Sequence, residues 1–471
     1  MKKKNGWSYS PYQPLFMETE LYICHVVPTI NSICFEWLDA GCEQYEVYWK
    51  EMEGEFRLFA VTNKCCCEIT NLSPDRDYAF YVCSGERKSA VRLARPGKVY
   101  GTVVNYLHPL DTAYSFSGNF LCSPCLLRHP DGFLLASMDV FQGCAPQNLT
   151  LIFRSDDDGE TWSYVSELFP CFWPRMFIHK GVLYILACST EYGDLLIGAS
   201  YDGGKSFTEP TVLFRGTNGK NKMPGVHKNP QPVVEYKGRI YNTLEWGSWG
   251  LGYHAAMVMS ADIDADLLSA DSWSFSQPLL YDENWEGVGK GRSAGTIEGC
   301  LTVGKDGQLY NVMRYDMLKM EARYGLALRY LVNTEDPEAP LSFERAIEFP
   351  ANHSKFEIRY DEKTETYFSI ASRITCPEDA GKRTLLSLLA SKDMVHWETL
   401  CDLIDERAND STGKKIGFQY VDFFWEGEDI IYLCRTAMNK AASFHDTNYI
   451  TFHRIPDFRK LLSLERTEEF G

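Results

Sequence analysis

Four side chains in the second half of the chain could together supply a nucleophile, its base and a clamp for an anionic group: Glu298, Arg314, Arg383 and Tyr420. A phenol with its usual pKa of about 10 is a poor nucleophile, so Tyr420 needs a neighbouring carboxylate to take its proton. Two guanidinium groups bind a carboxylate better than lysines would, because each presents a planar fork of donors. The residue types leave an alternative open, in which Tyr420 is a strand aromatic, Glu298 a rim residue and each arginine part of an ion pair.

The elements that must position these side chains are predicted to be β-strands, because short runs of alternating apolar and polar residues lie between turns. Aromatic residues make up 14% of the chain, and 35 glycines and 21 prolines supply many turns. Helical periodicity is scarce, and residues 262–271 are the clearest candidate for a short helix. The sequence therefore predicts an all-β protein.

A short motif recurs from residue 155 onward and predicts how the strands are grouped. Residues 155–162 read Ser-Asp-Asp-Asp-Gly-Glu-Thr-Trp, residues 200–207 read Ser-Tyr-Asp-Gly-Gly-Lys-Ser-Phe, and residues 391–397 are a shorter copy. The first two copies start 45 residues apart, which suits one four-stranded propeller blade, and the next gap of 191 residues is close to four more periods. In such a turn the aspartate accepts backbone N–H groups and the glycine takes a positive φ. The motifs resemble the Asp-boxes of sialidases, which implies a six-bladed propeller and turns that lie away from the catalytic face.

Residues 298–420 resemble the part of sialidases that carries their chemistry. The order Glu298, Arg314, Arg383, Tyr420 and the intervals of 16, 69 and 37 residues are close to the arrangement in that family. In sialidases the glutamate is the base for the tyrosine, the tyrosine forms a glycosyl-enzyme, and three arginines hold the sugar carboxylate. The resemblance implies that Tyr420 is the nucleophile, Glu298 its base, and the two arginines a substrate clamp.

Two positions depart from the sialidase pattern. The first arginine of sialidases opens the first blade, where this chain has Cys122. Their acid/base aspartate lies on a loop before the first Asp-box, where this chain has Cys144. One arginine and the usual acid are therefore missing, so we expect a retained propeller with a changed reaction or sugar rather than a standard sialidase.

Four other polar residues are candidates for the missing functions. Asp139 lies five residues before the lost aspartate and is the candidate acid after a rearrangement of its loop. His227 and His445 lie in polar segments where loops of a propeller would reach its face, and Glu245 lies beside two tryptophans that could stack on a sugar ring. We expect these last three to bind substrate; a solvated loop aspartate, hydrogen-bonded histidines and core tryptophans are the structural alternatives.

The first hundred residues predict a separate β-sandwich. Residues 33–37, 45–49 and 78–82 alternate well, and a proline turn precedes Tyr78, as in the tyrosine corner of many sandwiches. The segment resembles a fibronectin type III module. The predicted organisation is an N-terminal extension at 1–17, a fibronectin type III-like sandwich at 18–97 and a sialidase-like propeller at 98–471.

Composition excludes several classes of function. The 47 Lys and Arg residues against 64 Asp and Glu residues give a formal charge of −17, which leaves no basic face for a nucleic acid. No stretch approaches the roughly 18 apolar residues of a membrane span. No HExxH, zinc-spaced Cys/His set, EF-hand, Walker A or Rossmann motif occurs, so neither a metal nor a cofactor is predicted. The basic start without an apolar segment and the 16 scattered cysteines predict a cytoplasmic protein, or a secreted one whose signal peptide was removed.

Three hypotheses for function follow, and each has an oligosaccharide or glycan as ligand. The leading one is an exo-acting glycoside hydrolase of the sialidase-like superfamily that removes a terminal sugar, one that can carry a carboxylate. The second keeps the propeller but cleaves a uronate glycoside by β-elimination, with Tyr420 or a histidine taking the C5 proton. The third is a non-catalytic glycan-binding protein. The sequence leaves the oligomeric state open.

Overall fold

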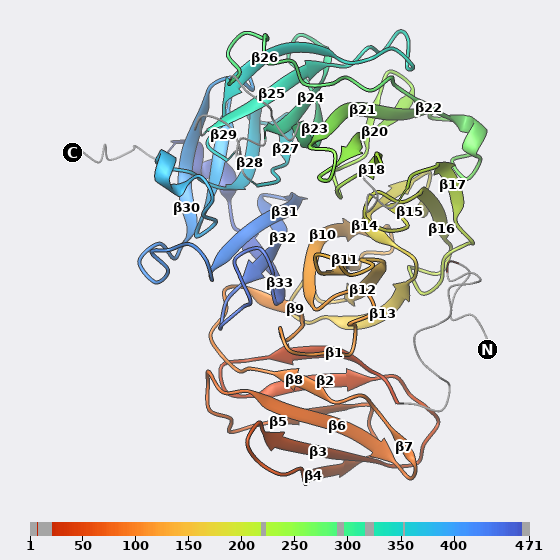
Figure 1. The fold of residues 1–471 in the computed structure, drawn as a ribbon, viewed down its shortest axis with the longest axis vertical. Helices are drawn as coiled ribbons and strands as arrows, with labels where there is room; N and C mark the ends of the chain where they lie inside the picture. Colours follow the sequence, from red (N-terminus) through yellow and green to blue (C-terminus); the bar gives the residue numbers. More distant parts are fainter. Residues whose placement is uncertain are drawn as a thin grey trace.

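The computed structural model describes residue 7 and residues 21–217, 223–289, 296–315, 325–351 and 354–463. These residues form 33 strands and three short 3₁₀ helices. Figure 1 shows two parts: a β-sandwich built from β1 to β8, and a ring of six sheets that surrounds a common axis. The prediction of an all-β chain with a six-bladed propeller and an N-terminal sandwich is confirmed.

The sandwich contains two antiparallel sheets. One consists of β1 (Ile23–Pro28), β2 (Ile33–Trp37) and β5 (Cys66–Ile69). The other consists of β4 (Arg57–Thr62), β3 (Tyr45–Glu51), β6 (Tyr78–Ser84), β7 (Arg87–Lys88) and β8 (Arg92–Ala94). Alternate residues of β2 point into the core between the sheets. The hydroxyl of Tyr78 accepts a hydrogen bond from the Ser73 N–H at 2.9 Å, as in a tyrosine corner; the likeness to a fibronectin type III module stays a prediction.

The first three blades each begin at the axis and run outward. The first contains β10 (Phe120–Arg128), β11 (Leu134–Phe141), β12 (Leu149–Ser155) and β13 (Ser163–Leu168). The second contains β14 (Phe172–His179), β15 (Val182–Cys188), β16 (Leu195–Ser200) and β17 (Thr211–Phe214). The third contains β18 (Gly225–His227), β19 (Val234–Tyr236), β20 (Arg239–Ser248), β21 (Tyr253–Asp262) and β22 (Trp273–Phe275).

The other three blades complete the ring (Figure 1). The fourth contains β23 (Thr296–Val303), β24 (Leu309–Tyr315), β25 (Leu326–Leu331) and β26 (Ser342–Glu348). The fifth contains β27 (Ile358–Asp361), β28 (Thr366–Ser372), β29 (Leu385–Ser391) and β30 (Trp397–Asp405). The sixth contains β31 (Gly417–Glu426), β32 (Asp429–Ala437), β33 (Tyr449–Ile455) and β9 (Thr102–Tyr106). The 3₁₀ helices are η1 (Ala270–Ser272), η2 (Pro377–Asp379) and η3 (Phe458–Ser463).

Two details differ from the sequence-based expectation. Residues 262–271 do not form a helix, because β21 continues to Asp262 and η1 begins only at Ala270. The third copy of the turn motif lies in the fifth blade, three blades after the second copy rather than four. The reason is that each of these blades, together with the connection to the next one, takes up more than 45 residues. Among the described residues, no helix is long and apolar enough to span a membrane.

The repeated turn motif joins the third and fourth strands of its blade. In residues 155–162 the Asp157 carboxylate accepts the Thr161 N–H at 2.9 Å, and Trp162 packs 5.7 Å from the ring of Phe452. In residues 200–207 the Asp202 carboxylate accepts the Ser206 N–H at the same distance. The motif therefore braces the outer half of a blade.

The ring is closed by strands from the two ends of the propeller segment. β9 precedes the first blade, yet it pairs with β33 as the outermost strand of the sixth blade, with Tyr106 opposite Tyr449. Both tyrosines also belong to the core cluster of the sandwich. The closing strand therefore serves the propeller and the sandwich at once.

The junction between the sandwich and the propeller is buried and polar. Arg92 on β8 forms an ion pair with Asp111 at 2.7 Å, and the two side chains are 4% and 0% exposed. His25 on β1 is hydrogen-bonded to the Val104 carbonyl of β9 at 2.8 Å.

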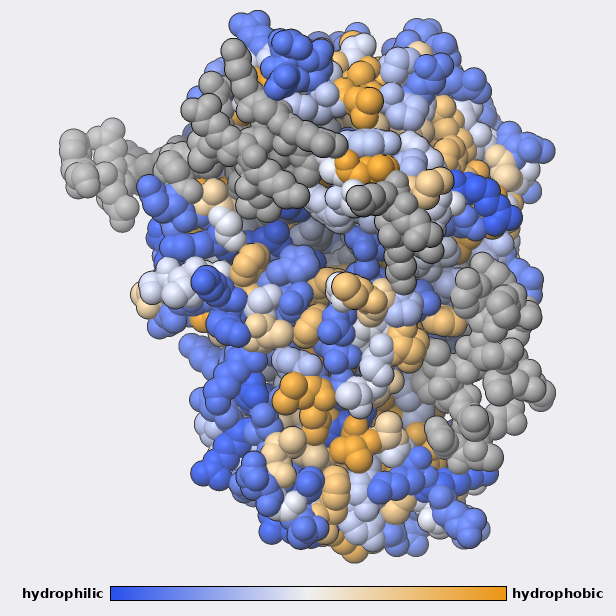
Figure 2. Space-filling model, viewed as in Figure 1, coloured by the Kyte–Doolittle hydropathy of each residue, from blue (hydrophilic) through white to orange (hydrophobic). Residues whose placement is uncertain are grey.

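On the face in Figure 2, hydrophilic residues predominate over both parts, and the apolar residues form small separate groups.

We predict that Asp111→Asn lowers the free energy of unfolding by about 3 kcal/mol, because the buried Arg92 guanidinium loses its counter-charge. Urea-induced unfolding, followed by tryptophan fluorescence, measures the loss. The control is Arg76→Ala, which removes an ion pair to Glu51 whose side chains are 64% and 48% exposed; we expect it to change the free energy by less than about 1 kcal/mol. Equal effects of the two variants would contradict the prediction.

Candidate active site

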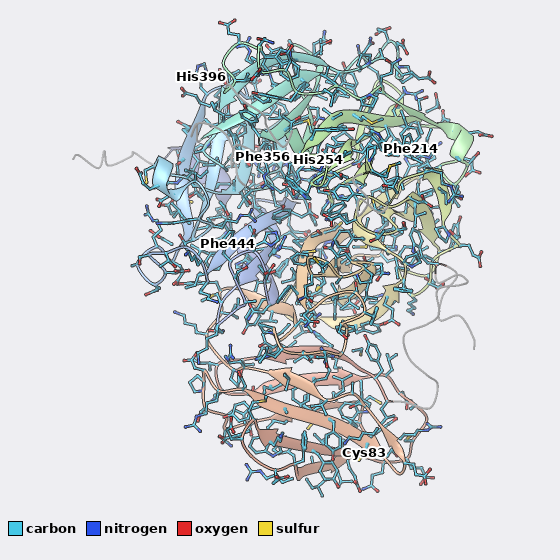
Figure 3. All side chains as sticks on the ribbon, viewed as in Figure 1. Cys83, Phe214, His254, Phe356, His396 and Phe444 are labelled. Atoms are coloured by element: carbon cyan, nitrogen blue, oxygen red, sulfur yellow. The ribbon has the colours of Figure 1, made fainter. Side chains whose placement is uncertain are left out.

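A cavity of about 870 Å³ lies where the inner strands of the blades meet. Its wall includes Glu298, Arg314, Arg383 and Tyr420, which come from three blades and lie up to 122 residues apart. Side chains of all six blades fill the ring around it, and Phe444, labelled in Figure 3, lies on its wall. The volume falls within the range of small-ligand sites.

A repeated irregularity of the inner strands points residues into this cavity. β10, β14, β23 and β31 each contain a β-bulge, and one residue of each bulge has left-handed backbone. These residues are Ser123 (φ 50), Trp173 (φ 53), Glu298 (φ 59) and Tyr420 (φ 55), and all four line the cavity. Left-handed backbone is uncommon for residues other than glycine and costs about 1–3 kcal/mol each. The four bulges therefore lower the stability of the fold, and they turn these four side chains out of the sheet toward the cavity.

Tyr420, Glu298 and Arg314 form one hydrogen-bonded group. The Tyr420 hydroxyl donates a short hydrogen bond to Glu298 Oε1. Arg314 Nη1 donates to Glu298 Oε2 at 2.7 Å and to the Tyr420 hydroxyl oxygen at 3.2 Å. All three side chains are at least nine-tenths buried. A phenol in this position has a carboxylate ready to take its proton.

The electrostatic environment keeps the phenol neutral and the carboxylate charged. Burial and the Glu298 charge raise the pKa of Tyr420 to about 12. Burial alone would raise the pKa of Glu298, but the Arg314 charge and the hydrogen bonds from Tyr420 and Arg314 outweigh it, so this pKa is lowered. In the resting state the proton therefore stays on the phenol, and the ionised carboxylate can accept it only as the phenol oxygen forms a bond to an electrophile.

Arg383 and Arg435 add positive charge beside the phenol. The guanidinium carbons lie 5.7 Å and 4.9 Å from the centre of the Tyr420 ring. Burial lowers the pKa of Arg383, and its cationic neighbours Arg314 and Arg435 lower it further. Cys122 on β10 lies on the same wall, and burial raises the pKa of its thiol. A third guanidinium, that of Arg435, reaches the cavity from β32.

An axial belt of four buried residues, Arg175, Gln231, Lys355 and Asp422, fixes the positions of the bulges. Arg175 Nη1 donates to Asp422 Oδ1 at 2.7 Å, and the Leu126 N–H donates to Oδ2 of the same carboxylate at 2.5 Å. Asp422 lies two residues after Tyr420. Three blades are therefore tied together next to the tyrosine.

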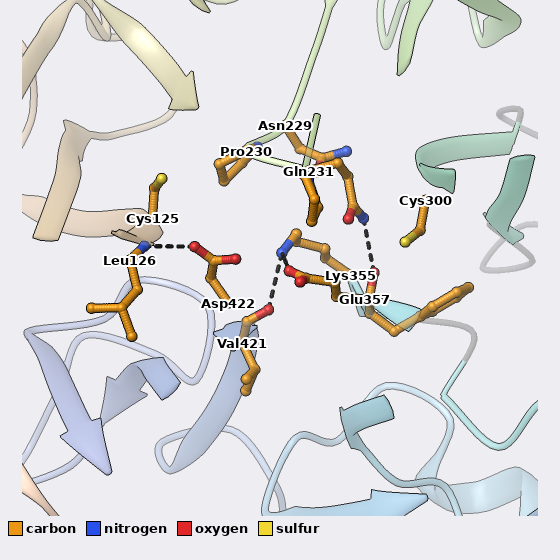
Figure 4. A network of polar contacts seen from close by, with 12 residues as sticks. Cys125, Leu126, Asn229, Pro230, Gln231, Cys300, Lys355, Glu357, Val421 and Asp422 are labelled. Carbon is orange, nitrogen blue, oxygen red and sulfur yellow. Dashed lines mark hydrogen bonds and ion pairs between the residues drawn. The ribbon is translucent and has the colours of Figure 1, made fainter. Parts of the chain in front are cut away.

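The rest of the belt holds the neighbouring backbone (Figure 4). Lys355 Nζ donates to the Val421 carbonyl at 3.0 Å. Gln231 Nε2 donates to the Glu298 carbonyl at 3.1 Å and to the Phe356 carbonyl at 2.8 Å. The backbones of both left-handed residues in the Tyr420–Glu298 pair are thereby anchored.

The structure places Asp139 differently from the sequence-based expectation. It lies within β11, opposite Cys122, and not on a loop. Its side chain is fully buried, accepts hydrogen bonds from Thr150 Oγ1 at 2.7 Å and from the Trp173 N–H at 2.9 Å, and is absent from the cavity wall. Burial raises its pKa to about 8. Asp139 supports the wall from behind.

The other three candidates divide between the wall and its support. His227 and His445 line the cavity, whereas Glu245 is fully buried on β20 and does not. Glu245 accepts a hydrogen bond from His227 Nδ1 at 2.6 Å, so it holds the histidine and has no place for a sugar. The His445 side chain is 46% exposed, yet its partial desolvation on the wall and the charge of Arg435 lower its pKa, which favours the neutral ring.

Several wall residues were not identified from the sequence. They are Trp173, Glu191, Arg435 and Asp446, whereas Trp249, one of the two tryptophans beside Glu245 that were expected to stack on a sugar, does line the cavity. No periodicity in the sequence predicts that Trp173 lines the cavity, because the direction of its side chain depends on a bulge with a positive φ. Arg435 could have been inferred only from the neighbouring position of β10 and β32 in the closed ring.

Comparisons with known proteins show the fold. No protein-family model and no curated protein matches the chain. An α-L-arabinanase from Penicillium chrysogenum, solved with arabinobiose, is 13% identical, covers 77% of this chain and 99% of its own, and superposes with a TM-score of 0.50. A leech intramolecular trans-sialidase is 9% identical, covers 95% of this chain and 93% of its own, and has a TM-score of 0.51. At these identities the likeness is one of architecture, that of the β-propeller.

We predict that Asp139→Asn changes how stability depends on pH. The folded protein keeps the Asp139 proton up to about pH 8, whereas the unfolded chain loses it near pH 4, so between these values this group makes unfolding easier as the pH rises. An asparagine does not ionise; its Oδ1 can still accept the Trp173 N–H, and its Nδ2 can donate to Thr150 Oγ1, whose own hydroxyl proton can go to the Cys171 carbonyl. The free energy of unfolding of the variant, relative to that of the wild type, should therefore increase from pH 5 to pH 8 by roughly 1 kcal/mol per unit or more. Urea titrations at four pH values measure the difference, and parallel curves would rule out a buried, protonated Asp139.

Proposed function

We propose that the protein is an exo-acting glycoside hydrolase of the sialidase-like superfamily, one that removes a terminal acidic sugar and differs from standard sialidases. The observation that carries the proposal is the contact of Tyr420, Glu298 and Arg314 at the wall of the axial cavity. The solved structures with the same architecture include enzymes that act on glycans, which supports a glycan as substrate.

The reaction follows from the pairing of phenol and carboxylate. Tyr420 oxygen attacks the anomeric carbon as its proton passes to Glu298; the glycosidic bond breaks, and the leaving oxygen takes a proton from a general acid. A neutral phenol approaches an anionic sugar without charge repulsion, and the Arg314 charge stabilises the negative charge that develops on its oxygen. Water then attacks the anomeric carbon of the glycosyl-enzyme and gives a proton to the conjugate base of that acid, and Tyr420 leaves with the proton held by Glu298.

The charge on the cavity wall favours an acidic sugar. Of the three guanidinium groups, Arg314 is matched by Glu298. Arg383 and Arg435 lie beside the Tyr420 ring, where a sugar carboxylate would lie within reach of both. Trp173 and Trp249 on the same wall offer flat apolar surfaces to a sugar ring.

A second candidate function is β-elimination from a uronate glycoside. His227 on the cavity wall, held from behind by Glu245, favours it, because a histidine held by a carboxylate can take the C5 proton while the arginines bind the uronate carboxylate. The C4–oxygen bond then breaks and a C4–C5 double bond forms, without addition of water.

Mass spectrometry of an oligosaccharide digest distinguishes the two reactions. The panel contains terminal acidic and neutral sugars, incubated with and without the protein. Products that gain water establish hydrolysis, and the released sugar identifies the substrate. Products of unchanged total mass that absorb in the ultraviolet establish elimination. If neither appears while glycans still bind, the protein is a binding module and the proposal is wrong.

We predict that Tyr420→Phe lowers kcat on the cleaved substrate by about a thousandfold or more, since the nucleophilic oxygen is lost. Binding of the same glycan, measured by calorimetry, should change by less than about tenfold. The matched control is Tyr432→Phe, at a buried tyrosine of the same blade that stacks on His453 away from the cavity. A Tyr420→Phe variant with wild-type turnover would exclude the tyrosine as nucleophile.

We predict that Arg383→Gln weakens the binding of a carboxylated glycan by about 10- to 100-fold, because a hydrogen bond to a charged group is lost. The carboxyl-reduced form of the same glycan should lose less than about threefold. Arg373→Gln is the control, since Arg373 pairs with Asp402 outside the cavity. Equal losses for the charged and the reduced glycan would argue against a carboxylate at this position.

A further inference from the structure

His227 is held in the cavity wall by a carboxylate that a ligand cannot reach. The two residues are opposite each other in the pairing of β18 with β20. His227 Nδ1 lies 2.6 Å from Glu245 Oε2, and the side chains are 4% and 0% exposed. A carboxylate in this position keeps a proton on Nδ1 and fixes the plane of the ring.

The second ring nitrogen of His227 is left for the cavity. The ring packs against Trp173 with centroids 4.5 Å apart and against His254 at 5.0 Å, so its orientation is set on both sides. Nε2 makes no hydrogen bond to the described residues, and His227 lines the cavity. An imidazole with one nitrogen bound to a buried carboxylate and the other facing a ligand site has the geometry of a proton-transfer group.

The charges around His227 favour its protonated form. Burial alone would lower its pKa, but the hydrogen bond and the charge of Glu245 outweigh it and raise the pKa above the ordinary value. Glu298 on β23 and Glu191 in the turn after β15 act in the same direction. Lys228, the next residue along the chain, directs its ammonium group to the carbonyls of Trp173 and Asn229. The imidazolium is therefore available near neutral pH.

The other ionisable residues on or behind the wall are less suited than His227 to donate a proton to a ligand. Glu191 accepts a hydrogen bond from Gln147 Nε2 at 2.7 Å. Asp446 Oδ1 lies 3.0 Å from His445 Nδ1, and a lowered pKa keeps that histidine in its neutral form, so it has no imidazolium proton to donate near neutral pH. Asp139 is buried behind the wall. The position of the sialidase acid is taken by Cys144, which is exposed and does not line the cavity.

We propose that His227 is the general acid and base of the reaction and that Glu245 is its positioning residue; this inference rests on the proposed hydrolase function. In the first step the Nε2 proton passes to the glycosidic oxygen as its bond to the anomeric carbon breaks and the bond to Tyr420 oxygen forms. In the second step Nε2 takes a proton from water as the water oxygen bonds to the anomeric carbon and Tyr420 leaves. One water is consumed, and each residue returns to its starting protonation state.

The test compares two leaving groups, because only a poor one needs a proton. The probes are the 4-nitrophenyl and the methyl glycosides of glucuronate, galacturonate, N-acetylneuraminate and arabinofuranose. The comparison uses a sugar that the wild type cleaves. For its methyl glycoside we expect His227→Gln to lower kcat/KM by about 10²- to 10⁴-fold. For its 4-nitrophenyl glycoside we expect the burst rate, which measures glycosylation of the enzyme, to fall by less than about tenfold. A purely structural role would lower both rates by the same factor.

Three further variants separate the possible outcomes. His254→Gln, at the neighbouring histidine outside the wall, should affect both probes equally. Glu245→Gln should move the alkaline limb of the kcat/KM profile to lower pH, since the charge that raises the His227 pKa is removed. Glu191→Gln should not show the leaving-group difference; if it does and His227→Gln does not, Glu191 is the acid and our inference is wrong. If the wild type cleaves none of the probes, the hydrolase function fails and the role of His227 fails with it.

Discussion

The buried ion pair between Arg175 and Asp422 is the interaction on which the cavity depends. Removing two charges from water costs several kcal/mol, which a pair offsets only with close contact and further hydrogen bonds. Here the carboxylate receives the Arg175 guanidinium at 2.7 Å and the Leu126 N–H at 2.5 Å, so that β14, β31 and β10 share one point on the axis. Because these two residues follow Trp173 and Tyr420 by two positions, the pair also determines where the bulges lie. A neutral replacement that packs as well would keep the ring and lose the position of the tyrosine.

The bulges explain how a sheet protein can supply a compact site. In a regular strand the side chains alternate between the two faces, and both faces of an inner strand are covered by neighbouring blades. A left-handed residue leaves this alternation, so Glu298 and Tyr420 turn toward the axis and meet although they lie 122 residues apart. Gln231 and Lys355 hold the adjacent carbonyl groups, which compensates for the strain. The site therefore belongs to the ring as a whole and to no single blade.

The architecture can be predicted from the sequence more completely than the site can. Alternation, turns and the repeated motif predict the sheets, because local patterns reflect burial on one face. The order and spacing of Glu298, Arg314, Arg383 and Tyr420 predict four residues that the structure does bring together. The expectation that Asp139 lies on a loop is wrong. This residue belongs to β11, a strand buried at every position, whose sequence therefore shows no alternation of apolar and polar residues. Arg435 reaches the cavity through the neighbourhood of β10 and β32, a relation created by closure of the ring that no local pattern records.

The pairing of β9 with β33 has a consequence for synthesis on the ribosome. The sandwich strands are made first and can pair with one another as they emerge, but the sixth blade has no outer strand until β33 joins β9, hundreds of residues later. Closing so long a loop is slow and entropically unfavourable. A nascent chain thus keeps the edges of its propeller exposed until β33 has been made, and a chain cut short before β33 lacks both the partner of β9 and the Tyr449 ring that packs in the sandwich core.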